Sequence, residues 1–328
     1  MKKELKFKNG NFRILCFSDS HGKKDFDRRV VRDIEAIVSN VNPDLVLFLG
    51  DNVWQDGAEN EDTLRAFMTA ITEPLTKRSI PWAHVFGNHD MERGFLTKDQ
   101  QPVYESIEGC ISEAGPEDIS GVGNWVFEIK SEFSDKTIYN VWGLDSGRGI
   151  GEFLAYCGLP SDTKVKLPDP LHMSSGYDTV KFDQQMWYWN ESKRIEEKNG
   201  GKVPGLMVMH MAFPEYCLLY KNVQETYFKG THREGVGNGP VNTGIFATLV
   251  QRGDVKTVVV GHDHINDCEG TYMGIKLAYD AGIGYDGYCH GDLRGGRIID
   301  IKESDPWNAD TYMVRSADYV ESYEYENT

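Results

Sequence analysis

The sequence has no long hydrophobic run. Nowhere in its 328 residues does an apolar stretch approach the roughly 18 uninterrupted residues that a membrane helix needs. Residues 1–6 are basic but are not followed by the apolar segment of a signal peptide. We therefore expect no membrane association and a cytoplasmic protein. A chain from which a signal peptide had been removed would look the same, so export stays open.

Positive charge is also scarce. The chain has 35 Lys and Arg residues against 51 Asp and Glu residues, which gives a formal net charge of −16. A generic nucleic-acid partner requires basic patches that displace counterions from the phosphate backbone, so this composition disfavours it and favours a small or protein-borne substrate. The six cysteines are scattered without a Cys-x-x-Cys pair, so neither a zinc knuckle nor a redox motif is indicated.

The chain contains no internal repeat and no linker. Its composition is 40% hydrophobic and 12% aromatic, which is ample for a sizeable core. We predict one domain over residues 1–328, with an acidic C-terminal extension from about 303 that lies on the surface or frays.

Alternating strand and helix patterns fill the first third of the chain. Apolar runs at 12–17, 44–49 and 82–86 each end in glycine or polar residues, and the intervening segments 30–41 and 61–77 have helical periodicity. Three such units predict an α/β fold with a largely parallel sheet, and ligands in such sheets lie beyond the carboxyl ends of the strands.

The later pattern is less regular. We predict a helix over 182–197, a helix starting at 245, and long loops over 148–177 and 220–243 that face the substrate. The predicted later strands are 124–130, 137–144, 205–209, 256–260, 276–280 and 297–301.

Potential metal ligands follow the strands. The set contains carboxylates, imidazoles and one amide but no thiolate, which suits Zn, Fe or Mn and is too rich in histidine for Ca or Mg. These residues are Asp19, His21, Asp51, Asn88, His210, His262 and His264. Seven ligands exceed what one ion binds, so we predict two ions that share Asp51 as a bridging carboxylate.

The order of these motifs is specific. D-x-H at 19–21, G-D at 50–51, G-N-H-D at 87–90, a strand-end histidine at 210 and G-H-D-H at 261–264 together resemble the calcineurin-like metallophosphoesterase superfamily. F-P-E at 213–215, R-E-G at 233–235, V-N-T-G at 241–244 and I-N-D at 265–267 look like its plant and fungal purple acid phosphatase-like branch, or like phosphatases that act on phosphoproteins.

The resemblance implies a four-layer α/β/β/α sandwich and two metal sets. One ion would be held by Asp19, His21, Asp51 and His264, and the other by Asp51, Asn88, His210 and His262. It also implies an enzyme that hydrolyses phosphate esters of a small molecule or a phosphoprotein, with monoesters favoured. In our mechanistic hypothesis, a hydroxide that bridges the two ions attacks phosphorus. His89 assists the leaving group and Arg233 neutralises phosphoryl charge.

One position departs from the family pattern. Purple acid phosphatases have a tyrosine three residues after the G-D aspartate, and calcineurin-type enzymes have an aspartate there that supports the catalytic histidine. In this chain the position is Trp54, so we expect no purple protein, and Asp90 becomes the candidate support for His89.

Three alternatives stay open. The same metal core could serve a phosphodiesterase or a nucleotide pyrophosphatase. The site could also bind phosphate without turnover, as in a regulatory protein. Arg233 could equally form a surface salt bridge.

Overall fold

The computed structural model describes residues 4–165, 176–221 and 228–328. Parts of the two predicted loops, 166–175 and 222–227, lie outside the described residues. No helix of the described part is both long enough and apolar enough to cross a membrane.

The first sheet has five strands in the order β11-β10-β1-β2-β3. Strands β1, β2 and β3 are mutually parallel, as predicted, whereas β10 runs antiparallel to β1 and β11 antiparallel to β10. The sheet is therefore mixed. Its strands are β1 (Asn11–Phe17), β2 (Leu45–Phe48), β3 (Trp82–His84), β10 (Gly295–Lys302) and β11 (Asp305–Arg315).

The second sheet has six strands in the order β4-β5-β6-β7-β9-β8. Its centre, from β5 to β9, is parallel, and each edge strand is antiparallel to its neighbour. The strands are β4 (Trp125–Lys130), β5 (Thr137–Gly143), β6 (Gly205–Val208), β7 (Val255–Val260), β8 (Glu269–Tyr272) and β9 (Ile275–Tyr279).

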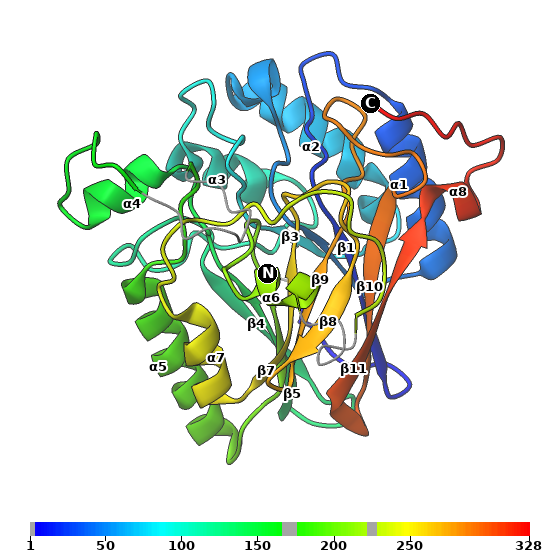
Figure 1. Cartoon of the computed structure of the whole chain (residues 1–328). Coiled ribbons are helices and arrows are strands. Elements are labelled where there is room, and N and C mark those ends of the chain that lie inside the picture. Colours follow the sequence, from blue (N-terminus) through cyan, green and yellow to red (C-terminus); the bar gives the residue numbers. More distant parts are fainter. Residues whose placement is uncertain (1–3, 166–175, 222–227) are drawn as a thin grey trace.

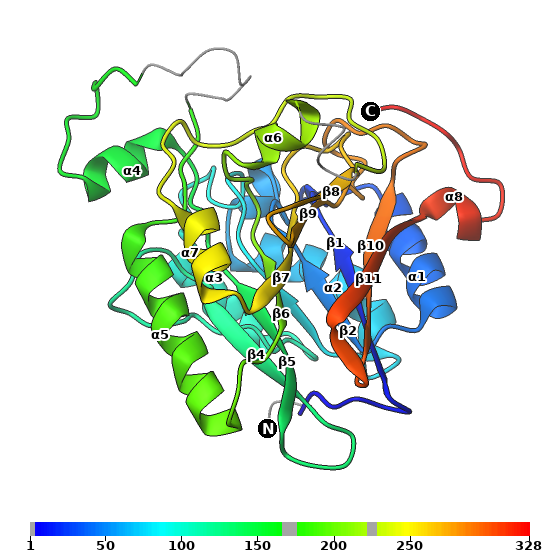
Figure 2. The ribbon, with the colours of Figure 1, turned by 60° about the horizontal axis from the view of Figure 1, so that its bottom comes forward.

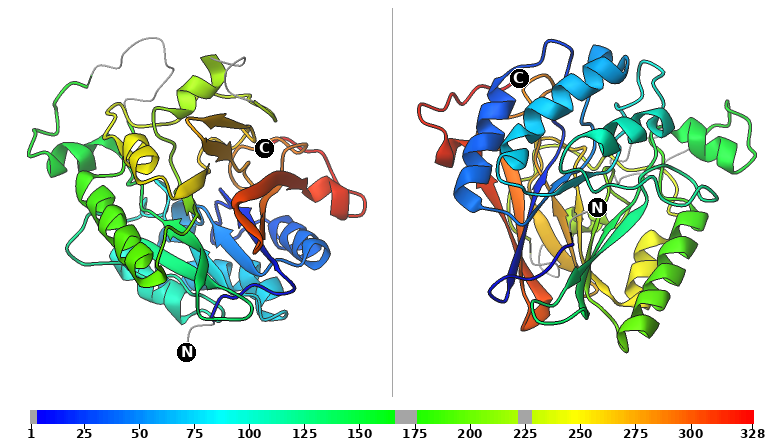
Figure 3. Two further views of the ribbon diagram at one scale, coloured as in Figure 1. Left: turned by 90° about the horizontal axis from the view of Figure 1, so that it is seen from below. Right: turned by 180° about the vertical axis from the view of Figure 1, so that it is seen from behind.

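Helices flank the pair of sheets. Figure 3 shows α1 on one side of the strands and α5 on the other. The longer helices are α1 (Arg29–Val41), α2 (Glu61–Thr76), α3 (Thr97–Ser106), α5 (Phe182–Asn199) and α7 (Ile245–Arg252). The short ones are η1 (Gln55–Ala58), α4 (Ile150–Tyr156), α6 (Tyr216–Lys221) and α8 (Ser316–Tyr319).

Three hydrophobic cores separate the layers. Because successive side chains of a strand point to opposite faces, Leu15 and Phe17 of β1 pack in the core that contains α1 and α2, whereas Ile14 and Cys16 pack in the core between the sheets. A third core joins the outer face of the second sheet to α5 and α7. The predicted four-layer α/β/β/α sandwich is confirmed.

The α1 helix shows why the sequence pattern identified these elements. Its buried apolar residues recur every three or four positions and pack in the core that it shares with the first sheet; they are Val30, Ile34, Ile37, Val38 and Val41. The helix ends at Asn42, which has the left-handed backbone conformation (φ 49°) and precedes a proline. Figure 1 shows α1 in blue beside β10.

The prediction for the C-terminal segment requires correction. The segment does lie on the surface, but residues 305–319 are not frayed, because β11 pairs with β10 and is followed by α8 (Figure 2). The apolar pattern is weak in this segment, since β11 is an edge strand with mostly exposed or half-buried side chains. The predicted loop from 148 also contains α4, which lies at the periphery of the molecule in Figure 2.

Candidate metal centre

The seven predicted ligands all follow strands whose carboxyl ends meet at one end of the sandwich. Asp19, His21, Asp51 and Asn88 come after β1, β2 and β3 of the first sheet. The histidines come from the second sheet: His210 follows β6, and His262 and His264 follow β7. Each of the two clusters described below combines residues from both sheets.

The backbone at these positions is strained. Asp19, His21, Asp51 and His262 have positive φ angles of 53°, 48°, 47° and 70°. A non-glycine residue in this conformation costs on the order of 1 kcal/mol, and such residues concentrate at functional sites. Gly87 is required next to them, because a Cβ atom there would lie 2.2 Å from Asp51 Oδ1.

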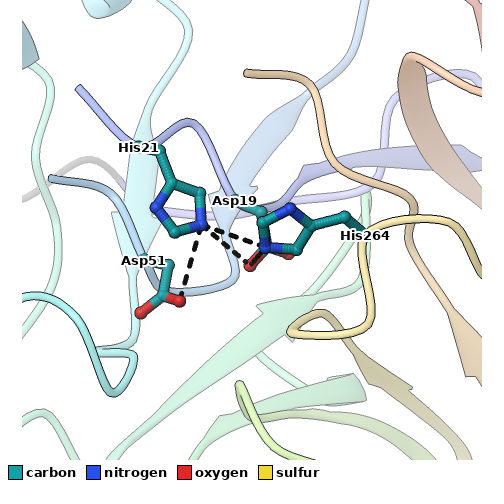
Figure 4. Close-up of side chains that lie close together, drawn as sticks. All are labelled: Asp19, His21, Asp51 and His264. Atoms are coloured by element: carbon teal, nitrogen blue, oxygen red, sulfur yellow. Dashed lines mark hydrogen bonds and ion pairs between the residues drawn. The ribbon is translucent and has the colours of Figure 1, made fainter. Parts of the chain in front are cut away.

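The first cluster contains Asp19, His21, Asp51 and His264, all buried, with ligand atoms that lie within 4.8 Å of one another. His264 Nε2 is 3.2 Å from Asp19 Oδ1, and His21 Nε2 is 3.6 Å from Asp51 Oδ2. The two imidazole Nε2 atoms are 3.0 Å apart. Figure 4 shows these side chains pointing toward one another.

The second cluster shares Asp51 and adds His210 and His262. His210 Nε2 lies 3.2 Å from Asp51 Oδ2 and 3.1 Å from the amide oxygen of Asn88. The structure therefore places Asn88 beside this group, and Asp51 stands between the two clusters as the bridging assignment requires.

Each of the two aspartates in the clusters has one oxygen that accepts a hydrogen bond and one that does not. One oxygen of each aspartate accepts a backbone N–H, from His262 for Asp19 and from His89 for Asp51. The other oxygens, Asp19 Oδ1 and Asp51 Oδ2, are buried and have no hydrogen-bond partner among the described residues. Buried carboxylate oxygens of this kind require a cation or a proton.

The histidine tautomers support the same conclusion. His264 Nδ1 is 2.5 Å from the carbonyl oxygen of Tyr288, and His210 Nδ1 is 2.9 Å from that of Leu49. A carbonyl oxygen only accepts, so each Nδ1 carries a hydrogen and Nε2 is the ring atom that faces the carboxylates. This outer hydrogen bond is the usual way in which proteins orient a histidine ligand. The residues therefore fit two transition-metal ions.

The electrostatics are those of a concentrated negative site. Burial opposes ionisation of Asp51 and Asp19, yet the neighbouring histidines hold the pKa of both carboxyl groups below its ordinary value. Although burial opposes the charged imidazole, Asp51 raises the pKa of His210 to about 10. Burial, and then the proximity of His210, lowers the pKa of His262 to about 3. The carboxylates thus stabilise a positive charge at Nε2 of His210, where a metal ion can take the place of a proton.

His89 lies beside the clusters but is held differently. Its imidazole is one-third exposed, its Nε2 is 4.0 Å from Asp51 Oδ2, and its Nδ1 is 2.5 Å from Glu92 Oε1. The Trp54 ring lies 5.7 Å from the His89 ring. Glu92 is therefore the acid that contacts this histidine. Sequence reasoning missed it, although an acid three residues along the same turn was a usable signal.

Asp90 has another role, which corrects its assignment as the support of His89. Its Oδ1 accepts the backbone N–H of Val53 at 2.9 Å, and its Oδ2 accepts that of Gly87 at 2.7 Å. Burial, together with Asp51, raises the pKa of Asp90 to about 7. Its carboxyl group braces the loops that carry Asp51 and Asn88.

Arg233 is likewise committed elsewhere. Its guanidinium forms a bidentate salt bridge with Asp292 at 2.6 and 2.7 Å and contacts His290 Nδ1 at 2.9 Å. The structure thus shows the alternative prediction for Arg233, a surface salt bridge. The next residue in the chain, Glu234, lines the cavity over the clusters instead.

A cavity of about 330 Å³ lies over the clusters. It contains metal-cluster residues, His89 and three aromatic side chains. Its lining is His21, Asp51, Trp54, His89, Tyr177, Glu234, Gly235, Val236, Gly237, His262, Asp263, His264, Gly287 and Tyr288.

The fold and the cluster define a class of protein. Two packed sheets, flanked by helices, bring two adjoining sets of carboxylate and imidazole donors to one edge, with a shared aspartate and an open cavity above. This is the architecture of a dinuclear metalloprotein on an α/β sandwich. The chain belongs to the calcineurin-like phosphoesterase family, whose sequence pattern matches residues 12–266.

Individual relatives agree with this family. The chain is 32% identical to probable inactive purple acid phosphatase 29 of Arabidopsis thaliana over 345 aligned positions, which cover 94% of this chain and 82% of the relative. It is 27% identical to phosphatase DCR2 of Saccharomyces cerevisiae, with 79% of this chain and 45% of that protein covered. The fold is similar to that of a dimetal phosphatase from Danio rerio, with a TM-score of 0.53, 13% identity and coverage of 92% and 98%.

Proposed function

We propose that the protein is a phosphoesterase that uses two transition-metal ions to hydrolyse phosphate monoesters. The observation that carries this proposal is the pair of buried carboxylate oxygens that lack a hydrogen-bond partner and face histidine Nε2 atoms, next to His89, which is one-third exposed and lines the cavity. The phosphorylated substrate would be a small molecule or a protein side chain.

Each metal set has a defined composition. Asp19, His21, Asp51 and His264 would hold one ion, and Asp51, Asn88, His210 and His262 would hold the other. Bound there, the ions supply positive charge that stabilises phosphoryl oxygens and lowers the pKa of water. Carboxylate, amide and imidazole ligands favour Mn, Fe or Zn as the bound ions.

The residues of the chain perform the remaining tasks. His89 donates a proton from Nε2 to the leaving oxygen, because the ring lines the cavity, Nε2 lies 4.0 Å from Asp51 Oδ2 and Nδ1 contacts Glu92. The Glu92 carboxylate contacts Nδ1 and fixes the orientation of the ring. Asp90 accepts hydrogen bonds from the backbone N–H groups of Val53 and Gly87 and so connects the loop of Asn88 and His89 to the loop of Asp51.

A second candidate is a protein that binds phosphate without turnover. The name of the Arabidopsis relative, probable inactive, favours it. The presence of His89 and Glu92 in contact favours catalysis instead, since a site that only binds phosphate has no use for an oriented proton donor.

The experiment is a metal-reconstitution assay. The protein would be stripped with a chelator, reloaded with Mn, Zn, Fe or Ni, and assayed with p-nitrophenyl phosphate and bis-p-nitrophenyl phosphate. We expect metal-dependent turnover with preference for the monoester. Preference for the diester would support the phosphodiesterase alternative, and nucleotide substrates in the same panel test for a pyrophosphatase. Binding of inorganic phosphate without turnover under any metal would support the non-catalytic candidate and refute the proposal.

A further inference from the structure

Three aromatic side chains surround the cavity over the metal clusters. Trp54, Tyr177 and Tyr288 all line it, and each is partly exposed, with Tyr288 at 48%. None of the described residues that line the cavity is a lysine or an arginine. We call the three residues the aromatic collar.

Each ring of the aromatic collar lies against a predicted metal ligand. The Trp54 ring meets the His21 ring at 5.3 Å in an edge-to-face arrangement, and Tyr177 meets His262 at 4.4 Å in the same way. Tyr288 stacks on His264 at 4.0 Å with an interplanar angle of 10°. The collar therefore stands directly beside the position where a phosphoryl group would be held.

Trp54 occupies the side on which a leaving group would lie. Its ring is 5.7 Å from that of His89, the proposed donor to the leaving oxygen, so the carbon group bonded to that oxygen must extend past Trp54. Lys23 Nζ lies 4.8 Å from the centroid of the Trp54 ring and helps to hold the indole in this position.

The charge of the cavity wall limits what this group can be. Glu234 lines the cavity, and its Oε2 accepts the hydroxyl of Tyr288 at 2.7 Å. A carboxylate in a wall whose described residues include no lysine or arginine disfavours a second phosphate or an acidic chain near the ester. Partly exposed aromatic rings, by contrast, gain free energy when another apolar ring covers them.

We propose that the aromatic collar selects aryl phosphate esters, with the aromatic leaving group packed against Trp54. This inference rests on the proposed function for the phosphoryl end of the substrate and adds the class of the organic end. A phosphotyrosine side chain and a free aryl phosphate share this chemistry.

The test measures equilibrium binding of phosphonates, which the enzyme cannot hydrolyse. Phenylphosphonate, cyclohexylphosphonate and methylphosphonate would be titrated into the metal-loaded protein by calorimetry. We expect phenylphosphonate to bind at least 10-fold more tightly than methylphosphonate and at least 3-fold more tightly than cyclohexylphosphonate. Equal affinities for the three, or no binding of any, would overturn the proposal.

Variants separate recognition from support of the metal ligands. Trp54→Ala and the bulkier Trp54→Leu should reduce the phenyl-to-methyl ratio to within about 3-fold, while Phe133→Ala, which removes an aromatic ring that is 86% exposed, should leave the ratio unchanged. A parallel loss of affinity for all phosphonates, with the ratio intact, would show that Trp54 only supports His21 and would refute the inference.

Two further outcomes distinguish this inference from the proposed function. Selective binding of phenylphosphonate without turnover of p-nitrophenyl phosphate would refute the proposed enzymatic function but support recognition of aryl groups by the aromatic collar. Turnover of p-nitrophenyl phosphate without a preference for phenylphosphonate would refute recognition by the aromatic collar but support the proposed enzymatic function. Comparison of a phosphotyrosine peptide with phenyl phosphate then identifies which source of the aryl ester is better bound.

Discussion

Replacing Glu92 by glutamine isolates the contact that we assign to proton donation. Glu92 Oε1 lies 2.5 Å from His89 Nδ1, and both side chains are about one-third exposed. Glutamine preserves the length and an acceptor oxygen but removes the charge. Hydrogen bonds to charged groups contribute about 1.5–3 kcal/mol in proteins, and partial exposure reduces this. We therefore expect the charged contact to supply about 1.4 kcal/mol, or a factor of about 10 in kcat.

The size of the loss should depend on the leaving group. An alkoxide leaving group needs the proton, so Glu92→Gln should lower kcat for an alkyl phosphate about 10-fold. A 2,4-dinitrophenolate leaving group needs no proton, so kcat for 2,4-dinitrophenyl phosphate should stay within about 2-fold of the unaltered protein.

The assay is steady-state kinetics on both substrates, with metal content measured on the same samples. Glu59→Gln, which alters an exposed acid, provides the matched control and should change neither rate. An equal loss on the two substrates would mean that Glu92 acts on folding or metal content. No loss on either would refute the role of the pair.

The remaining predictions concern metal binding and stability. Asp51→Asn should lower bound metal below two ions per chain and reduce turnover at least 100-fold, whereas Asp56→Asn should do neither; metal analysis after dialysis tests this. Buried His84 has its pKa lowered from 6.5 to about 3 by burial, so the unfolded chain binds a proton that the folded chain does not. The free energy of unfolding is therefore unaffected by the protonation of His84 above about pH 6.5 and falls by about 1.4 kcal/mol per pH unit below it. His84→Phe should remove this part of the pH dependence, measured by urea unfolding at several pH values. Buried Arg294 donates hydrogen bonds to the carbonyl oxygens of Gly284 and Glu326 and so holds the loop that contains Tyr288, whose carbonyl oxygen orients His264. Arg294→Lys should therefore weaken the binding of one metal ion about 5-fold, as measured by calorimetry.

The sequence indicated the ligand-bearing elements because each donor follows a strong apolar run. The run before Asp51, for example, is buried along its whole length, and a strand of this kind is recognisable without its neighbours. The parallel order of β1, β2 and β3 then follows from the intervening helices. Apolar runs also predict the later strands, and the family resemblance adds their assignment to a second packed sheet.

The supporting contacts were less predictable because they depend on backbone geometry. Asp90 and Glu92 are both acids close to His89 in sequence, and only the path of the turn decides that Glu92 reaches the imidazole while Asp90 turns back to Gly87 and Val53. Arg233 has a similar explanation, since its partner Asp292 is 59 residues away. Side-chain direction within a turn is not encoded in residue type alone.

The distribution of ligands over both sheets has a structural consequence. Asp19 and Asp51 follow strands of the first sheet, whereas His210 and His264 follow strands of the second. Within the two clusters the closest carboxylate-to-imidazole contacts, both 3.2 Å, therefore run between the sheets. Beneath them the sheets are joined by an apolar core, but at the site the interface consists of buried charged and polar groups. Such groups repel one another or remain unpaired unless cations lie between them. We therefore expect bound metal ions to stabilise the packing of the two sheets at this end of the sandwich. The cavity is bounded by predicted metal ligands, His21, His262 and His264 among them. The rings of the aromatic collar reach the cavity by packing on these three histidines.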